Sequence, residues 1–409
     1  MRRMSFPVVA LCAVLAIAGC QGDHPRVDRK GSPAPPEVVN ADLAVAKNGS
    51  AGLEPTRNLE LVATFRGPMP TGVAVSRFGR VFVCFPRWGD PVEHTVGEVK
   101  GDRVVPYPDD NVTKLQPRYA NNTFVSVQSV RVDAKDRLWI LDTGNINFGT
   151  NYPGGPKLVC MDLGTNKVVR QYNFPDDVAL ATTYLNDVRL DLTRGAEGTA
   201  YVTDSSDKGP NGIIVLDLAT GRSWRKLSGH PSVTPDRQFV PTVEGEPLKA
   251  RVPGQPEAFL RIGSDGIALS ADGKTLYVCP LASRRWYAVP TDALSHEDRG
   301  QGSVAADVRE LPRRDFASDG LESDAQGRVY LTDYEHNAVR RWTPGDAKFE
   351  TIAADPRMIW PDTLSLGPDG WLYVVANQLN RQALFQGKDE RQQPYTLFRV
   401  KTDGRPVQR

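Results

Sequence analysis

Carboxylate and amide side chains recur at one position of a phrase that this 409-residue chain repeats. Each copy of the phrase starts with a polar residue, which is followed by an apolar alternation, a turn and a second alternation. The starting residues are Thr71, Gln128, Asn186 with Asp187, Asp265, Asp319 and Asp362. Carboxylates that crowd together repel one another unless a positive charge lies among them. If the fold gathers these residues, they predict a site for a metal ion or a cationic ligand.

The residue types narrow the chemistry of such a site. Oxygen donors without thiolates and with few imidazoles suit Ca²⁺ or another hard divalent cation better than zinc or copper. The alternative for each starting residue is a turn cap, because Asp before Gly commonly bonds its own backbone. The sequence contains no Gly-x-Ser-x-Gly elbow, P-loop or dinucleotide fingerprint, so the chemistry of those motifs is not expected.

The repeats indicate the elements that position these residues. Period-two alternation with Gly, Asp or Asn in the turn is typical of β-hairpins. Two further short strands follow most hairpins, and four strands per repeat is typical of a propeller blade. The sequence therefore predicts an all-β, six-bladed β-propeller. The six hairpins are 71–75 with 80–84, 128–132 with 137–141, 186–190 with 199–203, 265–269 with 275–279, 319–323 with 328–332, and 362–366 with 371–375.

The two ends of the repeat array predict how the ring closes. Only one further strand, 396–401, follows the sixth hairpin, and one spare strand, 59–65, precedes the first. We expect the spare strand to complete the last blade, which removes the exposed edges of an open array. Two separate β-sandwiches would not account for a missing strand at one end and a spare strand at the other.

In a propeller the starts of the innermost strands converge on one mouth of the central channel, and the loops after the second strands return to that mouth. These loops carry Arg87, Trp88, Asp142, Asn145, Asp204, Asp207, Ser283, Arg284, Asp333, Glu335, His336, Asn377 and Gln378. A ligand-binding site at the central axis is therefore predicted, in which Trp88 stacks on the ligand. Its predicted residues are Trp88, Gln128, Asn186, Asp187, Asp265, Asp319, Asp362 and Asn377.

The N-terminus predicts export. Two arginines precede an apolar run, 6–17, and Ile17-Ala18-Gly19-Cys20 resembles a bacterial lipobox. We expect residues 1–19 to be a lipoprotein signal peptide, Cys20 to be lipidated, and 20–58 to be a flexible tether. The alternative is ordinary cleavage with Cys20 unmodified. The expected location is the bacterial cell envelope, with membrane contact through the lipid anchor only.

Charge and cysteine content limit the partners. The chain has 50 Lys and Arg against 49 Asp and Glu, so no field attracts nucleic acid. A small-molecule ligand and a monomeric chain are expected. Cys84, Cys160 and Cys279 lie in strand-like runs and are expected to be buried small hydrophobes, with one disulfide as the alternative.

Nearly the whole stretch 59–400 resembles the yellow/major royal jelly protein family. The resemblance implies a six-bladed propeller, but members include dopachrome-converting, amine-binding and storage proteins, so it implies no single activity. The segments that carry it are 70–76, 81–89, 126–133, 138–144, 156–158, 184–188, 276–283, 318–321, 360–364 and 376–379.

A more distant similarity points to the calcium-dependent gluconolactonase/senescence-marker propellers. It implies metal ligands at Asn186 and Asp265, but Pro70-Thr71-Gly72 stands where those proteins supply a metal-binding Glu. The first functional hypothesis is therefore binding of a small aromatic or aminated ligand at the axis. The second is a divalent-metal-dependent lactonase with an axial Asp as base. An isomerase of the dopachrome-converting kind and a rim that binds proteins remain open.

Overall fold

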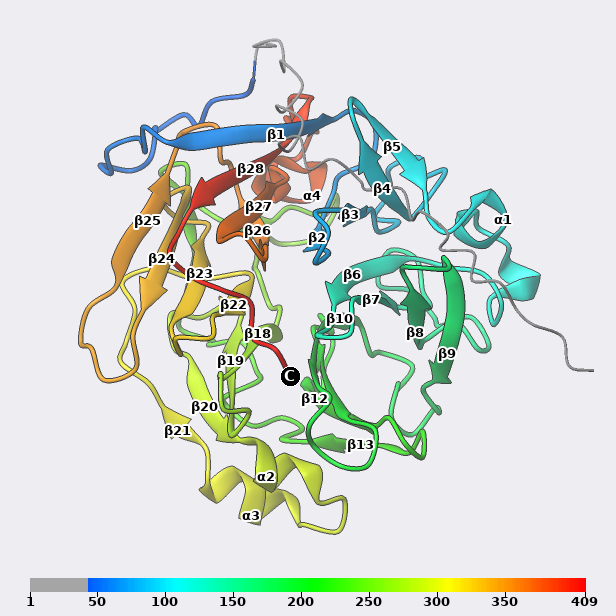
Figure 1. Ribbon diagram of the computed structural model, residues 1–409. Helices are drawn as coiled ribbons and strands as arrows, with labels where there is room; N and C mark the ends of the chain where they lie inside the picture. Colours follow the sequence, from blue (N-terminus) through cyan, green and yellow to red (C-terminus); the bar gives the residue numbers. More distant parts are fainter. Residues whose placement is uncertain (1–42) are drawn as a thin grey trace, which may run out of the picture. The chain divides into compact units, whose positions relative to one another are not determined.

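The computed structural model describes residues 43–409, and most of its regular elements are β-strands (Figure 1). Six sheets of four antiparallel strands form the blades. Blade 1 is β2 (Gly72–Val75), β3 (Val81–Cys84), β4 (Val96–Lys100) and β5 (Arg103–Pro106). Blade 2 is β6 (Val127–Val132), β7 (Arg137–Asp142), β8 (Lys157–Asp162) and β9 (Lys167–Asn173). Blade 3 is β10 (Leu185–Asp191), β11 (Thr199–Asp204), β12 (Gly212–Asp217) and β13 (Ser223–Lys226).

The remaining blades follow after a long insertion. Blade 4 is β18 (Ser264–Leu269), β19 (Thr275–Pro280), β20 (Tyr287–Pro290) and β21 (Arg309–Glu310). Blade 5 is β22 (Leu321–Ser323), β23 (Val329–Asp333), β24 (Ala338–Trp342) and β25 (Glu350–Ala354). Blade 6 is β26 (Pro361–Leu366), β27 (Trp371–Ala376), β28 (Tyr395–Lys401) and β1 (Leu59–Phe65). The short helices between strands are α1 (Asp110–Thr113), η1 (Pro117–Tyr119), α2 (Thr291–Ser295) and α3 (Gln301–Ala306).

The blades form a closed ring. The innermost strands β2, β6, β10, β18, β22 and β26 each contact the next one, and β26 contacts β2 again. The predicted all-β, six-bladed β-propeller is therefore confirmed. The closing strand is confirmed as well: β1 pairs antiparallel with β28, with Leu59 opposite Val400 and Phe65 opposite Tyr395.

The apolar core lies between neighbouring blades. An aromatic residue in the second strand of each blade packs against the following blade, as Trp139 does against Leu185 and Ala200. The same role falls to Phe82, Tyr201, Tyr277, Tyr330 and Tyr373. These aromatic residues therefore pack between neighbouring blades. Cys84, Cys160 and Cys279 are buried and free, as expected.

The segment before β1 corrects one prediction. Residues 20–58 were expected to be a solvated tether, but the described part, 43–58, packs on the propeller. Ala44 and Ala46 are buried against Ile359, and the Ala46 N–H donates to the Pro356 carbonyl at 2.8 Å. Side-chain hydrogen bonds add to these contacts, since the Lys47 N–H donates to Glu244 at 2.8 Å and the Asn337 amide donates to the Gly49 carbonyl at 2.9 Å. The predicted signal peptide, Cys20 and the rest of the predicted tether lie outside residues 43–409. Within residues 43–409, no helix is long and apolar enough to span a membrane.

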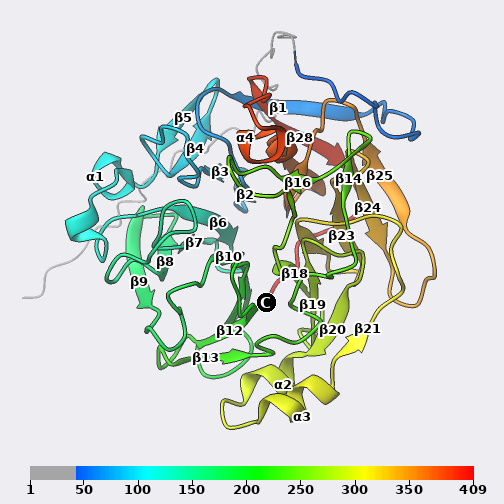
Figure 2. The same cartoon turned by 180° about the vertical axis from the view of Figure 1, so that it is seen from behind.

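Two segments cover the face seen in Figure 2. The insertion between blades 3 and 4 forms the hairpins β14 (Thr242–Val243) with β15 (Glu246–Pro247) and β16 (Lys249–Ala250) with β17 (Ala258–Phe259). The loop after β27 forms η2 (Leu379–Arg381) and α4 (Ala383–Gln386). Buried Glu244 joins the two segments, because it accepts from Arg381 at 2.6 Å and from Asn380 at 2.8 Å.

Candidate functional site

A cavity of about 520 Å³ opens at the axis below these two segments. Its floor holds polar residues from the starts of the inner strands, namely Gln128, Asn186, Asp265, Asp319 and Asp362. The apolar part of its walls and roof comes from Trp88, Phe148, Leu260, Ile262, Leu281, Leu379, Leu384 and Phe385. Arg391 also lines the cavity, and its guanidinium is paired with Asp90 and Asp389, which line the cavity as well.

Glycines explain why the carboxylates come so close to the axis. A Cβ on Gly266 would lie 2.2 Å from the Asp319 carbonyl oxygen, and one on Gly320 would lie 2.3 Å from that of Asp362. Any other residue at these two positions would push the inner strands of blades 4, 5 and 6 apart. The Asp-Gly pairs are therefore required by close strand packing, and the packing brings three successive aspartates together.

We call Asp265, Asp319 and Asp362 the axial aspartates. Burial, followed by the charges of Asp319 and Asp362, raises the pKa of Asp265 well above its usual range. Burial and the charge of Asp319 do the same to the pKa of Asp362. Burial also raises the pKa of Asp319 to about 7, against the opposing effect of hydrogen bonds from Trp360 and Asp265. No lysine, arginine or histidine of residues 43–409 pairs with these carboxylates, so protons reduce their repulsion.

Neutral donors hold each axial aspartate in place. The Asn186 amide donates to Asp265 Oδ1 at 2.7 Å, and the Trp360 indole donates to Asp319 Oδ2 at 2.8 Å. The Asn377 amide donates to Asp362 Oδ2 at 2.6 Å. Neutral donors orient a carboxylate without supplying the positive charge that would stabilise it fully.

The aromatic rings of Trp88 and Phe148 line one wall of the cavity, and Phe148 also stacks on buried Tyr184. The Phe148 ring lies 4.0 Å from that of Tyr184 and 5.9 Å from that of Trp88, centroid to centroid. The Trp88 indole donates to the Tyr184 hydroxyl at 2.6 Å, which donates in turn to Gln128 Oε1 at 2.9 Å. Phe148 has a φ of 54°, an unfavourable backbone conformation for a bulky residue, and such strain is often found at binding sites.

The structure brings together six of the eight predicted ligand-binding residues. Trp88, Gln128, Asn186, Asp265, Asp319 and Asp362 line the cavity. Asp187 does not line it, because its carboxylate accepts from Ser129 at 2.8 Å and from Arg189 at 2.7 Å. Asn377 is buried and reaches the site only through Asp362. Binding of a ligand by these residues stays a prediction.

Several residues that line the walls of the cavity were not predicted from the sequence. Phe148 had one usable signal, since it is an aromatic residue in a loop that returns to the same mouth, as Trp88 is. Leu260, Ile262, Leu384 and Phe385 had none, because they belong to the two covering segments, whose place over the axis depends on long-range contacts such as that of Glu244 with Arg381.

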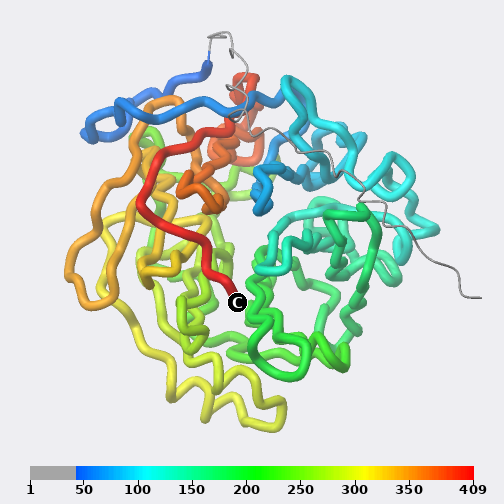
Figure 3. Tube along the Cα trace, viewed as in Figure 1, coloured from blue at the N-terminus to red at the C-terminus, as the bar shows by residue number. Residues whose placement is uncertain are grey.

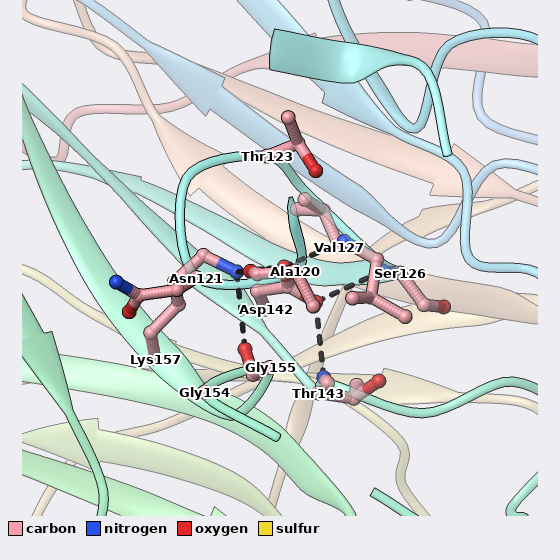
Figure 4. Close-up of polar contacts among 12 residues, drawn as sticks. Ala120, Asn121, Thr123, Ser126, Val127, Asp142, Thr143, Gly154, Gly155 and Lys157 are labelled. Carbon is pink, nitrogen blue, oxygen red and sulfur yellow. Dashed lines mark hydrogen bonds and ion pairs between the residues drawn. The ribbon is translucent and has the colours of Figure 1, made fainter. Parts of the chain in front are cut away.

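The aspartates that end the second strands have a different role. Asp142 accepts from the Lys157 ammonium at 2.7 Å, and Figure 4 shows this buried pair among backbone groups. Asp204 pairs with Arg225 at 2.8 Å and Asp333 with Arg340 at 2.8 Å. We call Asp142, Asp204 and Asp333 the blade aspartates. They join the strands of their own blades and do not line the cavity, although the sequence places them at the same mouth.

The residues present do not match the metal-binding set of the gluconolactonase-like propellers. Among residues 43–409, no group of three or more His, Cys, Asp or Glu side chains is arranged to hold a metal ion. Thr71 stands where a metal-binding Glu is expected from the similarity to the gluconolactonase-like propellers. It is buried and donates to the Gln128 carbonyl at 3.2 Å. The described residues therefore do not fit a divalent cation at the axis.

The fold and the site define a six-bladed β-propeller with a carboxylate-floored axial cavity. Over residues 125–404 the chain matches the major royal jelly protein family, and it belongs to that family. It is 29% identical to the Protein yellow of Drosophila melanogaster over 332 residues, which are 75% of this chain and 58% of that protein. With the Protein yellow of Drosophila guanche it shares 28% over 333 residues, 75% of this chain and 55% of that protein. The chain thus spans little more than half the length of these relatives.

Solved structures support the fold alone, because their sequence identity is low. A luciferin-regenerating enzyme aligns with a TM-score of 0.52 and 12% identity over 87% of this chain and 100% of that chain. A protein described as a putative gluconolactonase aligns with a TM-score of 0.51 and 13% identity over 90% of this chain and 100% of that chain.

Proposed function

We propose that the axial cavity binds a small organic cation, an amine with an aromatic or other apolar body. One observation carries the proposal: three buried carboxylates face the cavity without a cationic partner in the described chain. An ammonium group would lie among the axial aspartates, and its body would contact Trp88 and Phe148. Aromatic faces attract cations and stack on rings, so this wall suits the same class of ligand.

Binding of an ammonium ligand is expected to be coupled to the release of protons. The pKa values of the axial aspartates are raised, that of Asp319 to about 7, so their protonated forms are favoured in the free protein. An ammonium group favours their ionised form, and its binding must therefore release protons. The affinity is expected to increase as the pH rises through about 7, the pKa of Asp319.

Calorimetric titration with phenethylamine tests the proposal, with 2-phenylethanol as the neutral analogue. We expect the amine to bind and to release protons, which is seen as a heat that changes with the ionisation enthalpy of the buffer. Asp319→Asn should weaken binding at least about tenfold, the effect of one lost charge-assisted contact. Asp102→Asn, at a side chain 90% exposed, is the matched control. Equal binding of the alcohol, or unchanged binding in Asp319→Asn, would refute the proposal.

We also propose that the protein is exported and lipid-anchored through Cys20, on the basis of the lipobox-like segment 17–20. Cys20→Ser is then expected to move the protein from the membrane fraction to the soluble fraction without changing its melting temperature. If wild type and variant both fractionate as soluble proteins, there is no anchor.

A further inference from the structure

The floor of the axial cavity has two different halves. The starts of the inner strands of blades 4, 5 and 6 supply the axial aspartates, and those of blades 2 and 3 supply the amides of Gln128 and Asn186. The six inner strands contact one another in order round the axis, so blades 2 and 3 lie across the ring from blades 5 and 6 (Figures 1 and 3). A ligand whose ammonium group lies among the axial aspartates therefore has amide groups on its other side.

A β-bulge turns Gln128 toward the cavity. The pairing of β6 with β7 shifts between Val127 and Ser129, which leaves Gln128 out of the regular alternation. The Gln128 side chain is only 6% exposed, and it lines the cavity. Its Oε1 accepts from the Tyr184 hydroxyl at 2.9 Å, whereas its Nε2 donates to no acceptor of residues 43–409. A nearly buried donor of this kind indicates an acceptor that the described chain does not supply.

The aromatic wall fixes the orientation of the Gln128 amide. Tyr184 is buried, so the proton of its hydroxyl needs an acceptor. The Trp88 indole can only donate, and it donates to the Tyr184 oxygen at 2.6 Å. The Tyr184 proton is therefore left for the Gln128 carbonyl oxygen, and the Gln128 NH₂ group points away from Tyr184. The same hydrogen bonds connect Gln128 to Trp88, on which the body of the ligand is proposed to stack.

Asn186 complements this donor with an acceptor. Its Nδ2 donates to Asp265 Oδ1 at 2.7 Å, which leaves its Oδ1 without a donor among residues 43–409. Asn186 lines the cavity, and its strand β10 contacts β6, which carries Gln128. One free donor beside one free acceptor matches a hydroxyl group, because a hydroxyl accepts and donates at once. A ketone or an ether oxygen could only accept, and a second ammonium group could only donate.

The position of these groups in the cavity limits where the ligand carries its hydroxyl. Gln128, Asn186 and the axial aspartates all belong to the floor, whereas the aromatic and aliphatic residues belong to the walls and roof. A hydroxyl that contacts the two amides must therefore be close to the ammonium group, not at the far end of the apolar body. A vicinal amino alcohol carries the two groups on adjacent carbon atoms and meets this requirement.

We propose that the ligand of the axial cavity is a vicinal amino alcohol with an aromatic or other apolar body. Its hydroxyl accepts from Gln128 Nε2 and donates to Asn186 Oδ1, while its ammonium group lies among the axial aspartates. Gln128 thus determines the specificity for the hydroxyl. Recognition of the hydroxyl rests on the amine binding proposed above and adds a second functional group to the ligand.

Calorimetric titration of the full chain with 2-amino-1-phenylethanol and with phenethylamine, which lacks only the hydroxyl, tests this proposal. The wild type should bind the amino alcohol about tenfold more tightly, because phenethylamine leaves the Gln128 donor without an acceptor. Gln128→Met has a side chain of similar length without a donor, so the advantage of the amino alcohol should be lost. Gln171→Met, at an exposed position of β9, is the matched control and should keep the affinity ratio of the wild type.

The two enantiomers of the amino alcohol supply a second measurement. Different parts of the cavity hold the ammonium group, the hydroxyl and the ring, so the wild type should prefer one enantiomer. Tyr184→Phe keeps the ring that stacks on Phe148 and removes the hydroxyl that orients the Gln128 amide. The variant should therefore show a smaller preference, and it tests the proposal even if Gln128→Met does not fold.

The outcomes separate hydroxyl recognition from amine binding. If phenethylamine binds and the hydroxyl adds nothing, or if the advantage of the amino alcohol survives in Gln128→Met and Tyr184→Phe, the role of Gln128 is refuted and the amine site stands. If neither compound binds, the amine site and the hydroxyl recognition are refuted together. Tyramine carries its hydroxyl at the far end of the ring and should bind no more tightly than phenethylamine. A gain for tyramine alone would overturn the vicinal arrangement.

Discussion

The axial aspartates and the blade aspartates share one mouth of the propeller and differ in what balances their charge. Each blade aspartate has a cation of its own blade within 2.8 Å. The axial aspartates have neutral donors, one another, and raised pKa values. A buried carboxylate must be paired or protonated, and this molecule uses both solutions.

The difference shows how a scaffold separates stability from binding. A blade aspartate and its cation are both supplied by the fold, so the pair is complete and leaves nothing for a ligand. The axial aspartates have no cationic partner in the described chain, since the strands bring three carboxylates together without a lysine, arginine or histidine. Residue type alone does not mark a binding site. A buried carboxylate without a cationic partner in the fold is what indicates a binding site.

The largest effect is expected at a blade aspartate. Lys157→Met leaves the Asp142 carboxylate buried without its cation, which should lower the free energy of unfolding by about 3–5 kcal/mol. Denaturant unfolding measures this loss. Arg170→Gln is the control, because its pair with Glu197 is exposed and should contribute less than about 1 kcal/mol. The double variant Asp142→Asn/Lys157→Met should recover only part of the loss, because the Asn amide NH2 cannot accept the Val125 N–H that Asp142 Oδ2 accepts at 2.7 Å. Equal costs for Lys157→Met and Arg170→Gln would contradict the blade role.

A smaller effect is expected where the inner strands approach each other. Gly320→Ala places a Cβ 2.3 Å from the Asp362 carbonyl oxygen, so the strands must separate at a cost of about 1–3 kcal/mol. The separation should also bring the pKa of Asp319 closer to its usual value. Gly302→Ala, in helix α3 with nothing within 4 Å, should leave stability unchanged or slightly increased. Equal unfolding curves for the two variants would show that the Asp-Gly pairs are not needed for strand contact.

Over a change of one pH unit, the smallest effect is expected at the axial aspartates. Asp319 has a folded pKa of about 7 against an ordinary value of 3.8, so between these values only the folded state binds the proton. Stability of the wild type should therefore fall with rising pH, by about 1.4 kcal/mol for each unit inside that window. Asp319→Asn lacks this loss, so its stability relative to wild type should rise from pH 5.5 to 6.5 and level off above 7. Urea unfolding at each pH measures the difference.

Asp102→Asn should follow the wild type at every pH, because that side chain is exposed to solvent. A pH-independent difference between Asp319→Asn and the wild type would mean that the axial carboxylates are ionised in the free protein. The proton release proposed for amine binding would then lose its basis.

The ring of blades could be predicted from the sequence because each hairpin is encoded by one short segment of the chain. Each hairpin carries its own alternation and turn, and counting strands was sufficient to pair 59–65 with the last blade. The outer strands were less easily placed where a helix intervenes: the fourth strand of blade 4 is only Arg309–Glu310, because 301–306 form α3.

The site was only partly readable, for two physical reasons. The first is the β-bulge at the start of β10, between Leu185 and Val188, where adjacent residues no longer alternate as in a regular strand. Asn186 therefore faces the cavity, while Asp187 bonds Ser129 and Arg189. The second is long-range pairing: whether Asp142 faces a ligand or Lys157 depends on the register of β7 with β8, which spacing along the chain does not reveal.

The strand that closes blade 6 has a consequence for how the chain folds. Glu60 and Arg399 of the closing pair are 339 positions apart, so β1 must wait for nearly the whole ring before its partner exists. Loop-closure entropy rises only slowly with length, but until β1 docks the outer edge of β28 remains unpaired. In a concentrated solution of refolding chains, β1 of one molecule can pair with β28 of another. The product is a strand-exchanged dimer whose blades are all complete and which needs no interface beyond the one that each monomer already encodes.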